Sequence, residues 1–249
     1  MASLATPIYR GVIGVRFIFL SLKAWLLNMH VLSIIRFIPY LISKNLNIYC
    51  ILLLILCSFG HVSNAQKIPE TWEFPGKYHS LISFLADSLT DIHDVNIKVK
   101  EKSIGTTMAI RPSFFSLFKK PENRTYILCI NSDEAFDGVL LEEVPPEARV
   151  GLMAHELMHV RDYNSRRFPG LIKRGWQYLS GRGKHRFEHE IDQMVIDEGF
   201  GFFLYYWNAY VIDKSNASND YREFKKRIYM RPWSILTELN KMGEIELPE

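Results

Sequence analysis

The sequence predicts an α+β fold, in which a small sheet is followed by a mostly helical C-terminal half. Two short strands are expected where apolar and polar residues alternate, over 96–101 and 107–110, and Gly105 can turn between them. The run 125–131 is apolar on both alternating faces, which indicates a more buried strand. Beyond residue 145 the apolar spacing is helical almost throughout, so strands and helices separate along the chain.

The helices are placed by their apolar periodicity and by the residues that begin or interrupt them. A first helix is expected over 78–92, ahead of the strands. Pro145, Pro146 and Glu147 open a long helix through about Tyr163, because proline is tolerated in the first turn and an acid suits the positive end of the helix dipole. Further helical segments are expected at 170–179, 187–198, 202–212 and 221–239, with Gly199, Gly201, the polar loop 213–220 and Pro232 as interruptions.

The first 65 residues differ in charge from the rest of the chain. The remaining 184 residues hold 25 basic and 27 acidic groups, so the formal charge of +3 belongs to this leader. A near-neutral remainder offers no general field for phosphate, and we therefore expect no nucleic-acid partner. Residues 66–249 are enough for one compact domain. The leader contains no acid and five basic residues, which are Arg10, Arg16, Lys23, Arg36 and Lys44.

The leader has the features of a secretory signal peptide. An uncharged apolar run, 48–59, follows Lys44 and precedes small residues that end at Ala65. The run is shorter than the roughly 18 to 20 residues of a membrane span, which favours cleavage after Ala65 and export to the periplasm or the outside of the cell. Two alternatives stay open: translation can begin at Met29, or the apolar segments further upstream can hold the domain on a membrane.

One cysteine, Cys129, lies outside the leader, because Cys50 and Cys57 belong to it. A single cysteine can build neither a disulfide framework nor a thiolate metal cluster. Cys129 lies in an apolar run with no basic residue beside it, so we expect a packing residue and not a nucleophile.

The segment that carries chemistry has two histidines one helical turn apart. His155 and His159 are spaced i and i+4 on the long predicted helix, so both imidazoles leave the same face and can bind one ion. Glu156 projects about 100° away and can reach a water on that ion. Apolar residues surround all three, which predicts a helix buried on most sides. Zinc and its water would satisfy these polar groups, whose burial without partners is costly.

A third ligand is expected from the next strongly patterned helix, because a catalytic zinc uses three protein ligands and one open position. The candidates are Glu188, His189 and Glu190. Glu188 is favoured, because Asp192 follows one turn later on the same face and can accept the second N–H of a ligand histidine.

His155-Glu156-x-x-His159 followed by Glu188-x-x-x-Asp192 resembles the gluzincin metallopeptidases, the group that includes thermolysin and the prenyl-protease type. The resemblance covers only the segment from Val150 to Asp192, and the first motif is the more specific one. It implies a zincin-like fold, with a small sheet and a buried helix that carries the first motif. It also implies that His155, His159 and Glu188 bind Zn²⁺. By the same resemblance Glu156 is the catalytic base and Asp192 orients a ligand histidine. A metzincin is disfavoured, since neither the glycine nor the third histidine of that pattern follows His159.

The function expected from these residues is zinc-dependent hydrolysis of peptide or protein substrates. Zinc would lower the pKa of its water and polarise the peptide carbonyl, while Glu156 moves a proton to the leaving amine. An extended peptide can add to the edge of strand 125–131 if that strand lies beside the helix. The donor to the oxyanion is left open among Tyr178, His185, Tyr205, Tyr206 and Tyr210.

Two other functions are compatible with the motif. A secreted or membrane-associated module can hold a structural zinc and bind a partner through its aromatic C-terminal helices. Glu156 argues against this reading, because a structural site closes its coordination and has no use for a base. A zinc amidase that acts on a non-peptide substrate, such as a cell-envelope amide, carries the same residues as a peptidase.

Overall fold

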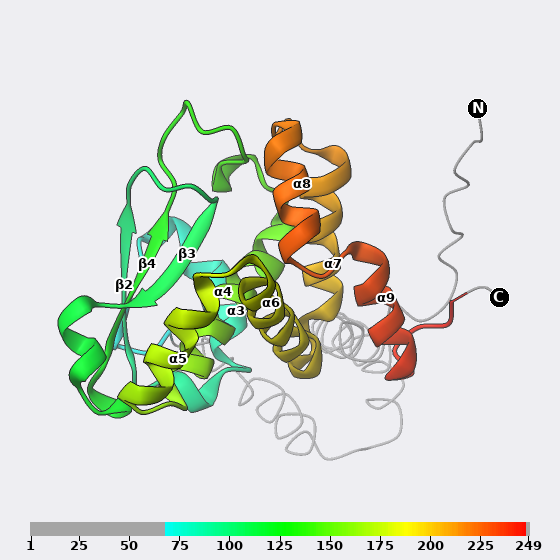
Figure 1. The fold of residues 1–249 in the computed structure, drawn as a ribbon. Helices are drawn as coiled ribbons and strands as arrows, with labels where there is room; N and C mark the ends of the chain where they lie inside the picture. Colours follow the sequence, from blue (N-terminus) through cyan, green and yellow to red (C-terminus); the bar gives the residue numbers. More distant parts are fainter. Residues whose placement is uncertain (1–67, 248–249) are drawn as a thin grey trace, which may run out of the picture. The chain divides into compact units, whose positions relative to one another are not determined.

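The computed structural model describes residues 68–247, and their fold is α+β, as the sequence predicted (Figure 1). A small mixed sheet is followed by a mostly helical C-terminal half. The predicted signal peptide, its cleavage site and the alternative start lie outside the described residues. Within 68–247, no helix combines the length and the apolar character that a bilayer span requires.

The sheet has four strands in the order β1-β2-β4-β3. β1, β2 and β4 run parallel, and β3 is antiparallel to β4. The chain bends at Gly105 between β2 and β3, as the sequence predicted, although β4 lies between these two strands in the sheet. β4 takes this internal place since it is apolar on both faces, and its Cys129 is buried and free, as expected of a packing residue. The strands are β1 (Trp72–Glu73), β2 (Asn96–Glu101), β3 (Met108–Pro112) and β4 (Thr125–Ile130).

β3 forms one edge of the sheet, with β4 as its neighbour and Ile110 opposite Leu128. The expectation that 125–131 offers an edge to a peptide is therefore wrong. The apolar pattern of 125–131 predicted a strand of the sheet. It did not show that β2 and β3 would flank this strand on both sides. The exposed edge beside the motif helix belongs to β3.

Seven helices follow the predicted pattern closely in the described part. They are α3 (His79–Ala86), α4 (Pro146–Asn164), α5 (Phe168–Tyr178), α6 (Gly181–Val195), α7 (Gly201–Ala209), α8 (Asn219–Ile228) and α9 (Pro232–Lys241). α3 is shorter than expected, and a separate 3-10 turn carries the buried Ile92. The break predicted at Gly199 is present, since this residue has φ 87° inside a π turn. Glycine is the residue that adopts this left-handed conformation without a steric cost.

α4 is buried along most of its length and packs directly against α7. At Gly151 the two backbones come so close that a Cβ would lie 2.0 Å from the carbonyl oxygen of Phe203. At the other end of α4, the fully buried Arg124 donates to the carbonyl oxygens of Tyr163 and Arg166, at 2.7 and 2.6 Å. Tyr163 is in the last turn of α4, where its carbonyl also accepts the N–H of Arg166 at 3.2 Å, and Arg166 follows the helix, so the guanidinium binds the C-terminal end of α4. Both contacts hold the motif helix in place.

Candidate metal centre

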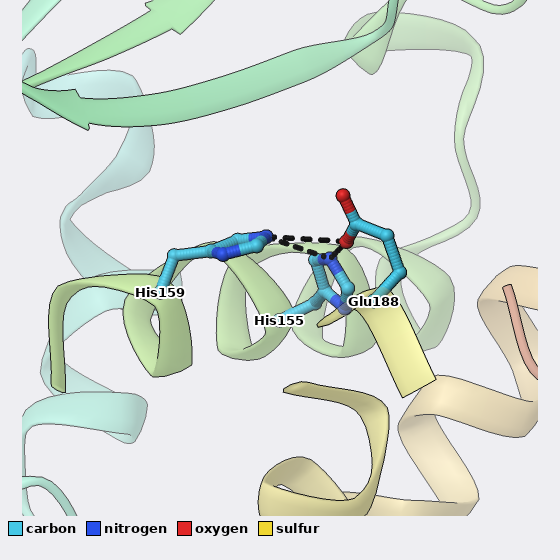
Figure 2. A group of neighbouring side chains, drawn as sticks. All are labelled: His155, His159 and Glu188. Atoms are coloured by element: carbon cyan, nitrogen blue, oxygen red, sulfur yellow. Dashed lines mark hydrogen bonds and ion pairs between the residues drawn. The ribbon is translucent and has the colours of Figure 1, made fainter. Parts of the chain in front are cut away.

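Two helices bring three potential ligand atoms together. Figure 2 shows the imidazoles of His155 and His159, on α4, pointing toward the carboxylate of Glu188, on α6. The Nε2 atoms of the two histidines are 3.2 Å apart, and they lie 3.2 and 3.3 Å from Oε2 of Glu188. Ligand atoms about 2.0 Å from a tetrahedral ion are separated by roughly 3.3 Å, so this spacing would fit such an ion.

The three side chains are buried, which is costly for polar groups unless they have binding partners. His155, His159 and Glu188 are 4, 4 and 0% exposed. Within the described residues, Nδ1 of His159 has no hydrogen-bond partner. The two Nε2 atoms and Oε2 of Glu188 face one another across this buried space, and each can present a lone pair to it. One divalent ion at the centre accepts all three lone pairs, so the group fits a metal.

Asp192 fixes the orientation of one imidazole. Its Oδ1 lies 2.8 Å from Nδ1 of His155, and its Oδ2 accepts the backbone N–H of Met230, also at 2.8 Å. When Nδ1 of His155 donates to Asp192, Nε2 is left with its lone pair toward the centre. This applies to the neutral imidazole. Without an ion, burial lowers the pKa of His155 but Asp192 and Glu188 outweigh it and raise the pKa to about 10, so a binding ion would displace the proton on Nε2.

Glu188 is held by a residue outside the motifs. The hydroxyl of Tyr178, at the end of α5, donates to Oε1 of Glu188, which leaves Oε2 facing the histidines. Burial alone would raise the pKa of Glu188, but His159 and His155 lower it well below the ordinary value, so the carboxylate is ionised. Burial and the charge of Glu188 raise the pKa of Tyr178, which keeps the phenol as a donor.

Glu156 lies between the metal group and the sheet. It is 5% exposed, and its Oε2 accepts the N–H of Ile110 in β3 at 2.8 Å. Burial raises the pKa of Glu156, although the nearby His159 and His155 oppose this effect. The carboxylate is therefore fixed at the point where α4 meets the edge strand.

The rival third ligands point elsewhere. Glu190 forms an ion pair with Arg174 at 2.5 Å. The ring of His189 stacks on His185 with centroids 4.0 Å apart, and both line a cavity of about 380 Å³ whose lining does not include His155, His159 or Glu188. Of the three candidates in this turn, the structure brings Glu188 to the histidines.

The same polar network ties the helices of the site together. Asp162 of α4 accepts hydrogen bonds from Arg166 and from Arg174 of α5, in each case with a shortest distance of 2.7 Å. Arg174 also reaches Glu190 of α6, as described above. The two helices that carry the ligand atoms are thus linked through α5.

The candidates for the oxyanion donor are scattered. Tyr178 is in the site but donates to Glu188. Tyr210 donates to the carbonyl of Glu143 at 2.9 Å, and the rings of Tyr205 and Tyr206 lie edge to face on α7. None of these four hydroxyls is therefore assigned to an oxyanion.

Sequence reasoning missed two aromatic residues of the site. Tyr163 stacks on His159, with centroids 5.8 Å apart and an interplanar angle of 20°. It follows His159 by one turn on α4, so helical spacing could have found it. Tyr229, after α8, lies 5.5 Å from the ring of His155, and no local pattern in the sequence connects the two.

No protein-family model matches the chain, and it matches neither a curated protein nor a solved structure. The resemblance to gluzincins therefore depends on the residues of the two motifs. The structure adds to it a buried group of His155, His159 and Glu188 that could hold a metal ion.

Proposed function

We propose that the protein is a zinc-dependent hydrolase, and specifically a metallopeptidase of the gluzincin type with a zincin-like fold. The observation that carries the proposal is the convergence of His155, His159 and Glu188, with Glu156 held beside them. Two nitrogens and one carboxylate oxygen are the donor set of catalytic zinc in metallopeptidases. Bound there, Zn²⁺ supplies a Lewis acid that makes a water and a substrate carbonyl more reactive.

The number of ligands favours catalysis over a structural role. Among the residues that the structure describes, the potential ligand group has three members. A tetrahedral ion held by three groups keeps one position for water or substrate, whereas structural zinc is closed by four protein ligands. A base beside an open position has a catalytic use.

Glu156 is the general base in this proposal. Its Oε2 is engaged by the N–H of Ile110, so Oε1 takes the proton of the attacking water and passes it to the leaving amine. Burial raises the pKa of this carboxylate above its ordinary value, which suits a base that must also return the proton as an acid.

The position of β3 supports a peptide as substrate. β3 is the edge strand, and it contacts the candidate base through Ile110. An extended peptide that pairs with this edge would run past the metal centre, with its carbonyls in register with the strand. The composition of the leader supports an exported protein.

The proposal is tested with the purified chain, by measuring bound metal and the cleavage of a peptide library. Glu156→Gln should retain the metal and lose turnover by several orders of magnitude, because the amide cannot accept the proton. Glu147→Gln, on the exposed first turn of the same helix, is the matched control and should behave as the wild type. Undiminished cleavage by Glu156→Gln would remove the base assignment.

The ligand assignment needs a second pair of variants. Glu188→Ala should lower the metal content, while Glu190→Ala should not, because Glu190 is paired with Arg174 and is turned away from the histidines. Metal retained by Glu188→Ala and lost by Glu190→Ala would require another third ligand. Cleavage of a non-peptide amide in place of peptides would keep the centre and change the substrate class.

A further inference from the structure

Two segments far apart in the sequence form one exposed apolar surface. The 3-10 turn Phe114–Phe118 follows β3, and the ring of Phe118 lies 4.9 Å from that of Phe168 at the start of α5. Along α5, apolar residues follow Phe168 at spacings of four, four and three, so they share one face of the helix. We call this region the aromatic–basic surface. Its exposed apolar members are Phe114, Phe115, Phe118, Ile172, Trp176 and Leu179.

The exposure of these side chains is large. Phe115 is 81% exposed, Trp176 69% and Leu179 76%. Six of the ten large hydrophobic side chains that are exposed in the described part of the chain lie on this surface. The opposite face of α5 is buried through Leu171 and Arg174. The helix therefore packs on the domain through that face, and its apolar face stays exposed. A contiguous exposed apolar surface on a water-soluble domain marks an interaction site.

Basic side chains predominate in the two segments that form this surface. The segments 103–121 and 165–187 contain ten basic residues and no acidic residue. Arg166 and Arg174 are paired with Asp162. Seven other basic residues of these segments are exposed and form no ion pair with a carboxylate of the described residues; they are Arg111, Lys119, Lys120, Arg167, Lys173, Arg182 and Arg186.

We infer that the aromatic–basic surface binds an anionic phospholipid membrane. Aromatic and aliphatic side chains on one face of a helix enter the boundary between headgroups and acyl chains, and surrounding Lys and Arg residues are attracted to anionic headgroups. A second copy of the chain is a poorer partner, because the positive rims of two such surfaces repel each other. Nucleic acid is also poorer, since Ile172 and Leu179 offer no ring on which a base could stack.

This binding mode holds the candidate metal centre close to the lipid. α5 ends at Tyr178, whose hydroxyl donates to Glu188 (Figure 1 shows α5 beside α6). Tyr178 thus connects the helix that would contact the membrane to a potential metal ligand. All residues of this surface follow the leader in the sequence, so the proposed membrane contact does not require residues of the leader.

The test is a partition experiment with the full chain and vesicles of phosphatidylcholine, with and without phosphatidylglycerol. Trp176→Ser should weaken binding to the anionic vesicles about tenfold, because it removes the largest apolar side chain of the surface. Trp233→Ser is the matched control, since Trp233 is 62% exposed on α9, and it should leave binding unchanged. Both variants keep the same leader, so any contribution of the leader cancels.

The charge is tested in the same assay. Lys173→Glu should weaken binding to anionic vesicles by roughly fivefold or more, and Lys214→Glu, an exposed control outside the surface, should not. Brominated lipid should quench tryptophan fluorescence of the wild type more than that of Trp176→Phe, which keeps an aromatic ring. Equal losses of vesicle binding by Trp176→Ser and Trp233→Ser would overturn the inference. It would also be overturned if the surface bound an oligonucleotide or a second copy of the chain while vesicle binding stayed unaffected by these substitutions.

Discussion

Asp192 and His155 are joined across two helices by a contact of 2.8 Å between Oδ1 and Nδ1. The other oxygen of Asp192 accepts the N–H of Met230, so both oxygens of the carboxylate are held. This arrangement sets the tautomer of His155 and aims Nε2 at Glu188 and His159. The contact therefore prepares the group for an ion before the ion binds.

Removing that carboxylate should weaken metal binding without removing a ligand. We expect Asp192→Ala to lower the affinity for Zn²⁺ between 10- and 100-fold, the usual effect of losing a partner behind a ligand histidine. The affinity is measured by competition with a chromophoric chelator. Asp197→Ala, an exposed carboxylate on the following turn, is the control and should bind zinc as the wild type does. Equal affinities of the two variants would mean that Asp192 does not orient a ligand.

Tyr229 is the residue that we expect to assist the reaction without binding the metal. Its ring lies 5.5 Å from that of His155, and burial together with the charge of Glu188 raises its pKa well above the ordinary value, so its hydroxyl stays protonated. If that hydroxyl donates to the developing oxyanion, Tyr229→Phe should lower kcat about a hundredfold and leave KM and metal content nearly unchanged. Tyr210→Phe, whose hydroxyl bonds to Glu143, is the control. A kcat equal to that of the control would exclude the role.

Local pattern was sufficient for the α+β class and for the contact between the two motifs. The i, i+4 spacing of His155 and His159 and the next patterned helix together predicted which side chains meet, because a helical face is a property of neighbouring residues. Strand order was not predictable in the same way. The placement of β4 between β2 and β3 depends on pairing between distant segments, which alternation alone does not specify. Tyr229 was missed for the same reason, since it reaches the site only through the packing of the C-terminal helices.

The close approach of α4 and α7 should make Gly151 intolerant of a side chain. A Cβ at this position meets the backbone of Phe203 at 2.0 Å, and backbone cannot turn aside as a flexible side chain can. We expect Gly151→Ala to lower the free energy of unfolding by about 1 to 3 kcal/mol, the range for overpacking.

Gly175→Ala is the control, because the same added atom on α5 meets nothing within 4 Å. Alanine there should be neutral or stabilising by up to about 1 kcal/mol, from its higher helix propensity. Denaturant unfolding of both variants checks the difference, and equal stabilities would refute the packing argument.

The buried carboxylate of Asp162 should make the stability of the fold depend on acid pH. Burial would raise its pKa, but the guanidinium groups of Arg166 and Arg174 outweigh this and lower the pKa below the ordinary value. Because the folded-state pKa is lower than the unfolded-state pKa of about 3.9, the stabilisation is complete above the latter and is lost as the pH falls through the folded-state value.

Asp162→Asn should therefore cost roughly 1.5 to 3 kcal/mol at pH 7, as expected for hydrogen bonds to charged groups, and progressively less below about pH 4. Urea unfolding over this pH range measures the difference, with the exposed Asp213→Asn as control. A difference between wild type and Asp162→Asn that did not change with pH would show that ionisation of Asp162 does not contribute, and the link between α4 and α5 would then depend on shape alone.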